Sequence, residues 1–296
     1  MEASEAIEHA RRYCRAVTRR RAGNFYYGLK LLPEPQRSAL YAVYAWMRRA
    51  DDLADEVDGD VDAARAALVR LKRQTDEALA GQPPIHDPVL VGLQQTSQRF
   101  NLSPACFHDL IEGQLDDLCG RSYGTFDDLR EYCYRVASTV GLICVEIWGY
   151  RDERVPQLAV GRGIAFQLTN ILRDFVEDYD AGRVYLPAED FARHDLRPDE
   201  LRQWCDEARC RAFLGEQIER AGSFYERSQA LDALVDPECL PTLWAMTTIY
   251  RRLLEKMRLE PAQIVLGSRI RLSAVSKGAI ALRARWQARP GRAATR

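Results

Sequence analysis

The sequence has almost no net charge: 42 Lys and Arg residues against 43 Asp and Glu leave a net charge of -1 over 296 residues. Phosphate backbones are normally met with a clear basic excess, so we expect no nucleic-acid partner. Long apolar runs are missing too, since none approaches the roughly 20 residues that a membrane span needs. The N-terminus carries Glu2, Glu5 and Glu8 and lacks a signal-peptide pattern. These absences predict a cytoplasmic protein.

Cysteine pairs and histidine clusters are absent as well. The 8 cysteines contain no C-x-x-C pair, and the 4 histidines have no zinc-ligand spacing. Cys205 and Cys210 are five residues apart but lack further partners for a metal or redox site. We therefore expect reduced core thiols.

Long proline-free intervals rich in Ala, Leu, Arg, Glu and Gln are what the chain does contain, at 36–82, 105–155, 157–186, 199–236, 242–260 and 262–289. These are good helix formers, and no stretch alternates apolar with polar residues long enough to indicate a sheet. Ser103 followed by Pro104 predicts a helix start. Because no long polar linker divides the chain, we predict one all-α domain over 1–296, ending in a basic tail at 278–296.

The C-terminal region is basic throughout. From Arg269 to Arg296 it holds 8 basic residues and no acidic one. Such a segment is suited to peripheral contact with an anionic membrane surface. A solvated, partly frayed terminus explains the same composition, and the two readings stay open.

The first acidic motif, Asp51-Asp52-Leu53-Ala54-Asp55-Glu56, directly follows an apolar helical run at 38–47. Asp51 and Asp55 are four residues apart, so they share one face of a helix. Carboxylates are rarely buried without partners, which makes this an unusual continuation of a core helix. The alternative is a helix that emerges into solvent, with (i, i+4) pairs such as Arg48 with Asp52.

The second acidic motif forms a polar stripe on an apolar helix. Asn170, Asp174 and Asp178 follow one another at steps of four, with Gln167 and Arg173 alongside. Three oxygen-bearing side chains in line suit Mg²⁺, which takes one or two carboxylates together with waters and substrate phosphates. Arg173 offers the alternative of a purely structural neutralisation.

Two such faces inside a helical bundle, near arginines, would capture a diphosphate through Mg²⁺, or through Mn²⁺ in its place. The metal would neutralise the charge that develops on the leaving group. An aromatic lining would accept hydrocarbon tails and stabilise a carbocation. The aromatic candidates are Phe25, Tyr26, Tyr27, Tyr41, Tyr44, Phe166 and Phe175. The implied substrate is a prenyl diphosphate.

With these motifs in order, the chain from about Tyr13 to about Lys277 resembles the squalene/phytoene synthase family. The resemblance is carried by Phe25-Tyr26-Tyr27 with Leu31-Leu32-Pro33, by 41–55, by 112–118, by 132–141, and by 167–178 closing in 182–187. It implies the all-α isoprenoid synthase fold, a helical bundle around a central cavity.

The resemblance also implies roles for individual residues. Metal ligands would be Asp51, Asp55, Asn170, Asp174 and Asp178. Substrate contacts would come from Arg48, Asn24, Gln167, Asn170, Asp117, Phe25 and Tyr44. Residues at the reacting diphosphates would be Tyr134, Arg173 and Tyr250, together with Asp51 and Asp174. Asn24 stands where many members have a small hydroxyl residue, so that contact is expected to be altered.

The implied reaction is a head-to-head condensation of two prenyl diphosphates. Phe25-Tyr26-Tyr27 resembles bacterial presqualene diphosphate synthases of the squalene and hopanoid route, so we expect two farnesyl diphosphates to give presqualene diphosphate. The alternatives are phytoene from two geranylgeranyl diphosphates, or a C30 squalene or dehydrosqualene product, with NADPH needed only if the reaction continues to squalene. Other enzymes of the pathway are possible partners. A non-catalytic assembly protein of this fold is a further alternative, but the intact acids favour catalysis.

Overall fold

The structure, a computed structural model, describes residues 3–55, 60–84 and 86–287, and the side chains of Ala3, Asn24, Asp55 and Gln287 lie outside that description. The described residues are overwhelmingly helical and contain no β-strand, apart from an isolated bridge between Tyr150 and Val235. The predicted all-α class is therefore confirmed. None of the described helices is both long and apolar enough to cross a membrane.

The helices follow one another with short connections. Their bounds are α1 (Ala3–Arg21), α2 (Asn24–Leu29), α3 (Gln36–Asp55), α4 (Val61–Leu79), α5 (Pro88–Ser97), α6 (Pro104–Leu118), α7 (Phe126–Cys133), the π-helix η1 (Tyr134–Ser138), α8 (Thr139–Trp148), α9 (Val155–Asp180), α10 (Ala188–Arg193), α11 (Pro198–Gln203), α12 (Glu207–Arg227), the 3₁₀-helix η2 (Gln229–Ala233), α13 (Leu240–Leu259), α14 (Gln263–Leu266) and α15 (Ala274–Gln287).

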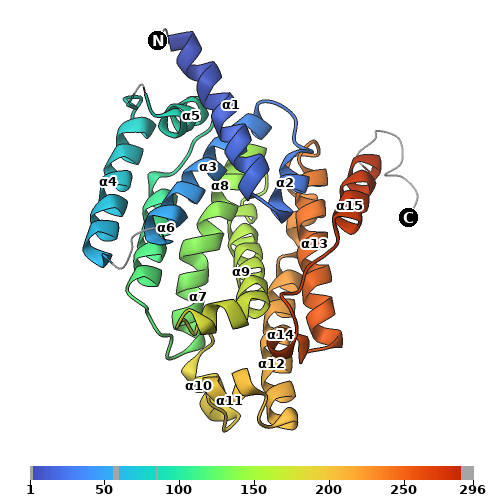
Figure 1. Cartoon of the computed structure of the whole chain (residues 1–296). Helices are drawn as coiled ribbons and strands as arrows, with labels where there is room; N and C mark the ends of the chain where they lie inside the picture. Colours follow the sequence, from blue (N-terminus) through green and yellow to red (C-terminus); the bar gives the residue numbers. More distant parts are fainter. Residues whose placement is uncertain (1–2, 56–59, 85, 288–296) are drawn as a thin grey trace.

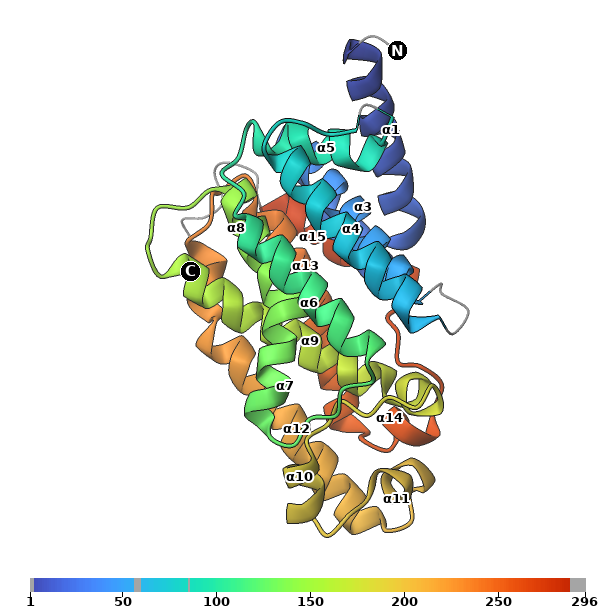
Figure 2. The same cartoon turned by 90° about the vertical axis from the view of Figure 1, so that its left-hand side faces the viewer.

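Helix α9 runs through the middle of the bundle (Figure 1). It packs against α8, α12, α13 and η1. On one side α3 contacts α1, α4, α5 and α6, and on the other α13 contacts α2, α12 and α15. The short helices α10 and α11 lie at the end of the bundle opposite the N-terminus (Figure 2). Both acidic motifs thus belong to interior helices, α3 and α9.

Two hydrophobic clusters hold these helices together. In the N-terminal half, Trp46 packs edge-on against Phe107 with ring centroids 4.8 Å apart, and its indole N–H donates to Thr75 at 2.8 Å. In the C-terminal half, helices α9, α12 and α13 contact one another and contribute to a second cluster, in which Phe213 on α12 stacks on Phe191 on α10 with ring centroids 4.4 Å apart. Phe25 on α2 packs against both clusters. The short helix α2 therefore lies where the two halves of the core meet.

Helix starts follow the sequence signals. Helix α6 begins at Pro104 with Ser103 as its N-cap, as the Ser-Pro pair predicts. Helix α5 begins at Pro88, and the carboxylate of Asp87 accepts from the N–H groups of Val89 and Leu90. Such caps satisfy backbone donors that the first turn leaves without partners.

The cysteines follow the prediction in the main. All 8 are free, and 6 are buried, whereas Cys119 and Cys205 are exposed. Burial raises the pKa of the buried Cys144 thiol to about 12, so it stays protonated at neutral pH. These thiols act as small apolar side chains.

Part of the predicted basic tail is folded. Helix α15 covers Ala274–Gln287 and packs its buried Ile280 and Ala284 toward α13. Val275 and Leu282 on the same helix are exposed. The remaining tail arginines, Arg289, Arg292 and Arg296, lie outside the described residues. Membrane contact through this region stays a prediction.

The π-helix η1 is held between α6 and α9 by two glycines. A Cβ on Gly113 would lie 2.5 Å from Val136 Cγ1, and a Cβ on Gly163 would lie 2.5 Å from the Cα of Ser138. The helices approach so closely because neither glycine carries a side chain. At Gly163 the obstacle is backbone, which cannot rotate away.

We predict that Gly163→Ala destabilises the fold by about 1–3 kcal/mol through overpacking against η1. Gly161→Ala is the matched control on the same helix, because its Cβ would meet only Ser228 at an ordinary 3.7 Å. The control should be neutral or slightly stabilising, since Ala is the better helix former. Urea unfolding of the three proteins measures this, and equal stabilities for the two variants would contradict it.

Candidate active site

The first acidic motif ends helix α3. Arg48 pairs with Asp52 and lies 3.7 Å from an oxygen of Asp51, and Arg21 on α1 donates to Asp52 at 3.0 Å. The local pair of Arg48 with Asp52 is thus present, as the structural alternative predicts. Asp51 also accepts a hydrogen bond from the side chain of Gln114 on α6 at 2.9 Å. The motif therefore contacts a second helix and is not simply a helix end in solvent.

The second motif is charge-paired on α9. The Asp174 carboxylate accepts from Arg173 Nε at 2.7 Å, and also from Arg269 Nε and Nη2 at 2.8 and 2.9 Å. Arg269, from the segment between α14 and α15, lies 3.2 Å from Glu177 as well. The side chains of Arg173 and Asp174 are only 13% and 18% exposed. Two guanidinium groups thus neutralise one half-buried carboxylate.

Helix α6 joins the two motifs. Its Gln114 binds Asp51, and its Asp117, three residues further on, lies on the same side of the helix. The charge of Asp117 contributes to a raised pKa at Asp178, which places Asp117 close to the second motif. One face of α6 therefore contacts Asp51 through Gln114 and, about one turn further on, approaches Asp178 through Asp117.

Asp117 is held by tyrosines. Tyr132 and Tyr185 each donate to its carboxylate at 2.8 Å, and their rings stack with centroids 5.1 Å apart. Burial raises the pKa of Asp117, while the two hydroxyls and the charge of Arg183 lower it. The tyrosines supply the donors that a buried carboxylate requires.

Tyr250 on α13 lies at the meeting point of three helices. It is buried, and its hydroxyl is within hydrogen-bonding reach of Arg173 and Asn170. Its ring lies 4.6 Å from that of Phe166 on α9 and 5.6 Å from that of Phe25 on α2. Phe25, Phe166 and the ring of Tyr250 thus form one aromatic wall. The hydroxyl of Tyr250 connects this wall with the polar stripe of α9.

Tyr44 on α3 connects the first motif to the same centre. Burial, and then the charge of Asp51, raise its pKa to about 12, and Tyr250 is close enough to contribute. Burial likewise raises the pKa of Tyr250, with Arg173 opposing it. Both hydroxyls therefore keep their protons at neutral pH.

Cations from the C-terminal segment complete the second motif. Besides Arg269, Lys277 on α15 lies near Arg173, because that charge helps burial to lower the pKa of Lys277. In the sequence, Arg269 and Lys277 were identified only as members of a basic run. The structure shows that the run begins as a component of the candidate site.

The acids of the site are crowded. Burial, then the charges of Asp174 and Asp117, raise the pKa of Asp178 to about 7, although Arg183 opposes the shift. Asn170 Oδ1 is buried and has no hydrogen-bond donor among the described residues. A buried carbonyl oxygen without a donor and, about two turns along the same helix, a carboxylate that resists ionisation both indicate that this stripe lacks positive charge.

The chemistry of this donor set fits Mg²⁺. Asn170, Asp174 and Asp178 offer hard oxygen ligands on one stripe, which is what Mg²⁺ prefers. Within the described part of the chain, no three His, Cys, Asp or Glu side chains converge on one point. Mg²⁺ takes one or two protein carboxylates and completes its shell with water and substrate phosphates.

The remaining predicted residues fall into three groups. Gln167 accepts from the amide of Asn170 at 3.3 Å, and so belongs to the stripe. The Tyr134 hydroxyl instead donates to Asp109 on α6 at 3.3 Å, whereas the neighbouring Tyr132 contacts Asp117. The predicted roles of Asn24 and Asp55 fall on side chains outside the description.

Sequence reasoning missed several participants, namely Gln114, Tyr132, Arg183, Tyr185 and Arg269. Four of them lie in segments that carry the family resemblance, which was the available signal. Arg269 had no signal beyond its place in a basic run.

Comparisons with known proteins point to one family. The family model described as squalene/phytoene synthase matches residues 18–276. A 15-cis-phytoene synthase from Synechococcus elongatus is 38% identical over 85% of this chain and 83% of its own. The phytoene synthase of Mycobacterium bovis is 37% identical over 93% of this chain and 90% of its own.

A solved structure shows the same fold. A dehydrosqualene synthase in complex with a ligand superposes with a TM-score of 0.84 at 30% identity, over 97% of this chain and 99% of its own. The isoprenoid synthase fold that the resemblance implied is thereby confirmed.

We predict that ionisation of Asp178 destabilises the metal-free protein progressively as the pH rises from about 4 to about 7. The folded chain holds the Asp178 proton up to about pH 7, whereas an unfolded chain releases it near the ordinary value of 3.8, so ionisation opposes folding across this interval. Asp178→Asn removes the effect. The Tm difference between variant and parent, measured in EDTA, should grow over this interval and level off above about pH 7. An equal difference at the two ends would contradict the assignment.

Proposed function

The chain belongs to the squalene/phytoene synthase family, whose members condense two prenyl diphosphates head to head, and from that premise we propose that it makes phytoene from two geranylgeranyl diphosphates. The observation that carries this choice of product is the name shared by its relatives in Synechococcus and Mycobacterium, phytoene synthase. The expectation of presqualene diphosphate rested on Phe25-Tyr26-Tyr27 alone and gains no support from these relatives.

A C30 product from two farnesyl diphosphates is the second candidate. It is favoured by the likeness to the dehydrosqualene synthase structure, which extends over nearly the whole chain. The two candidates share every step and differ in the length of the prenyl tails. Neither phytoene nor dehydrosqualene needs NADPH, since the final cation loses a proton instead of accepting hydride, whereas squalene would need it.

The chain's own cations would bind the diphosphates. Arg48 lies beside the first motif, and Arg173, Arg269 and Lys277 lie beside the second. Guanidinium groups match the geometry of phosphate oxygens in a bidentate manner. Mg²⁺ held by Asn170, Asp174 and Asp178, and by Asp51 with Asp55 opposite, would supply the further positive charge that ionisation of a diphosphate requires.

Tyr44 and Tyr250 would act as hydrogen-bond donors in this site. Burial raises the pKa of each, so the proton stays on the phenol oxygen at neutral pH. A neutral hydroxyl can donate to a diphosphate oxygen but is a poor acceptor of a proton from the substrate. Departure of the diphosphate is therefore where we place their contribution.

The aromatic wall would protect the cation. Phe25, Phe166 and the ring of Tyr250 pack together beside the polar stripe. Ring faces attract a carbocation through their quadrupoles, and their apolar surface excludes the water that would quench it. The arrangement thus separates a charged end, where the diphosphate leaves, from an apolar region for the tails.

We predict that the purified chain converts geranylgeranyl diphosphate with Mg²⁺ to phytoene, at the same rate with and without NADPH. Incubation with farnesyl diphosphate in parallel, with extraction and mass analysis of both mixtures, measures the preference. Efficient turnover of only the C15 substrate would refute the phytoene assignment and favour the second candidate. If neither substrate is consumed with Mg²⁺ or Mn²⁺, the chain is not a synthase.

We predict that Asp51→Asn and Asp174→Asn each lower kcat at saturating Mg²⁺ by at least about 100-fold, because each removes negative charge that holds the metal and its diphosphate. Circular dichroism should show that the helices are retained. Asp180→Asn is the matched control: it lies on α9, is exposed, and pairs with Arg202. If either site variant turns over substrate about as fast as the parent, the assignment of Mg²⁺ to these carboxylates is wrong. An equal loss of kcat in the control would contradict it as well.

A further inference from the structure

A cavity of about 540 Å³ lies between α1, α3 and α5. It is lined by Ile7, Ala10, Arg11, Cys14, Glu34, Pro35, Ser38, Ala39, Ala42, Gly92, Gln95, Thr96, Arg99 and Phe100. Its α3 residues Ser38, Ala39 and Ala42 lie at least six positions before Arg48, about 9 Å along the helix at 1.5 Å per residue, and no residue of the candidate site is among the lining residues. The cavity is therefore separate from the candidate active site.

Small side chains form the floor of this cavity. Ala10, Cys14, Ala42 and Gly92 let the three helices approach, and a Cβ on Gly92 would already lie 3.1 Å from Ala42 and 3.2 Å from Cys14 Sγ. Burial raises the pKa of Cys14 to about 12, so its thiol is protonated and unreactive at neutral pH. The floor is apolar and suited to binding, without a nucleophile for chemistry.

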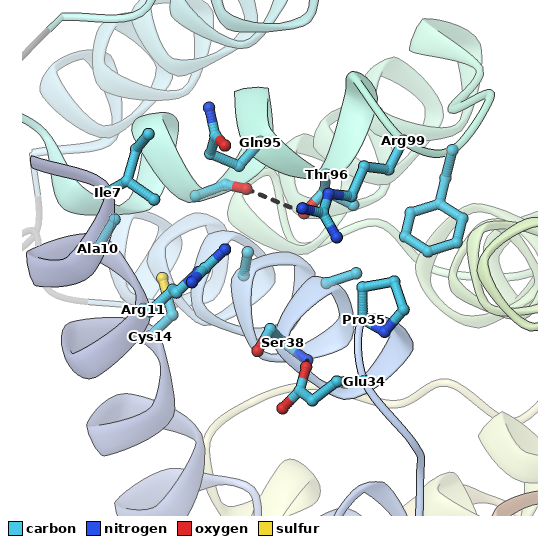
Figure 3. Close-up of a pocket in the computed structure, with 14 residues that line it drawn as sticks. Ile7, Ala10, Arg11, Cys14, Glu34, Pro35, Ser38, Gln95, Thr96 and Arg99 are labelled. Atoms are coloured by element: carbon cyan, nitrogen blue, oxygen red, sulfur yellow. Dashed lines mark hydrogen bonds between the residues drawn. The ribbon is translucent and has the colours of Figure 1, made fainter. Parts of the chain in front are cut away.

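Two arginines stand at the cavity without partners. The side chains of Arg11 on α1 and Arg99 after α5 point toward the space from different sides (Figure 3). Both are exposed, and neither forms an ion pair or a side-chain hydrogen bond with any described residue. What distinguishes them from the other unpaired surface arginines is their place in the lining of the cavity, where they offer uncompensated positive charge.

The one acid among the lining residues does not neutralise them. Glu34 accepts from Arg37 Nε at 2.9 Å and from the backbone N–H of Ser38 at 3.1 Å. These bonds outweigh burial and lower the pKa of Glu34. The negative charge of Glu34 is thus compensated by Arg37 and Ser38 at the start of α3. The positive charges of Arg11 and Arg99 at the cavity have no such compensation.

We propose that this cavity binds a single-chain amphiphile with an anionic head group, a carboxylate or a phosphate. The apolar floor would hold the hydrocarbon chain, and Arg11 with Arg99 would hold the head group through charge-assisted hydrogen bonds. The volume lies within the range of small-molecule sites, which combine an apolar lining with a few polar groups that fix orientation. A bare inorganic anion would leave the floor unfilled, and a neutral chain would leave both arginines unused.

Calorimetric titration of the full chain in EDTA tests this proposal, with dodecyl phosphate and laurate as probes and with dodecanol and inorganic phosphate as controls. We expect one equivalent of at least one anionic probe to bind, more tightly than either control. Binding of dodecyl phosphate alone identifies a phosphate head group, and binding of laurate a carboxylate. Absence of binding by both anionic probes overturns the proposal.

Paired variants locate the site. Arg11→Gln with Arg99→Gln should weaken binding about tenfold for each arginine removed, because hydrogen bonds to charged groups are lost. Arg12→Gln with Arg19→Gln is the matched control, since both residues are exposed on α1 and outside the lining. An equal loss in the control pair, or dodecanol binding as tight as the anionic probes, would refute the assignment. Retention of binding in Asp174→Asn would separate this site from the candidate active site.

Discussion

The concentration of half-buried carboxylates beside α9 is the constraint on which the rest of the site depends. Asp117, Asp174 and Asp178 are close enough for their charges to add, and burial removes the water that would screen them. Each of these carboxylates is stabilised in a different way. Asp174 is paired with two guanidinium groups, Asp117 takes two tyrosine hydroxyls, and Asp178 resists ionisation up to about pH 7. A fold that needed only stability would not gather these groups, because apolar residues of similar volume would be as favourable.

The same constraint explains why helices remote in sequence meet here. Helix α6 supplies Asp117 and Gln114, and α13 supplies Tyr250. The segment after α14 supplies Arg269. The close approach that allows this at α6 and α9 depends on Gly113 and Gly163, which leave room for η1. Packing and electrostatics thus act together, since a bulkier residue at either glycine would shift the helices that carry the acids.

The stripe of Asn170, Asp174 and Asp178 was predictable because its period of four is a local property of one helix. The helix start at Pro104 and the all-α class were predictable for similar reasons, from local propensity. The contacts of Arg269 and Gln114 were not, because each joins residues more than 60 positions apart and depends on tertiary packing. The first motif contains one contact of each kind. The ion pair of Arg48 with Asp52 follows from their local spacing, whereas the hydrogen bond of Gln114 to Asp51 does not. The length of the product could not be predicted, because Phe25-Tyr26-Tyr27 contributes only part of the aromatic wall beside the site.

The two guanidinium groups on Asp174 differ in how readily they can yield to a cation. Arg173 is only 13% exposed and lies within reach of Tyr250, so removing it from Asp174 would leave a buried charge without its partner. Arg269 is 33% exposed, comes from the segment between two helices, and keeps Glu177 as a second partner at 3.2 Å. Because an exposed ion pair contributes little, exchanging Arg269 for a metal ion costs less than exchanging Arg173. The released guanidinium would remain beside the site, where a diphosphate would offer it a new partner.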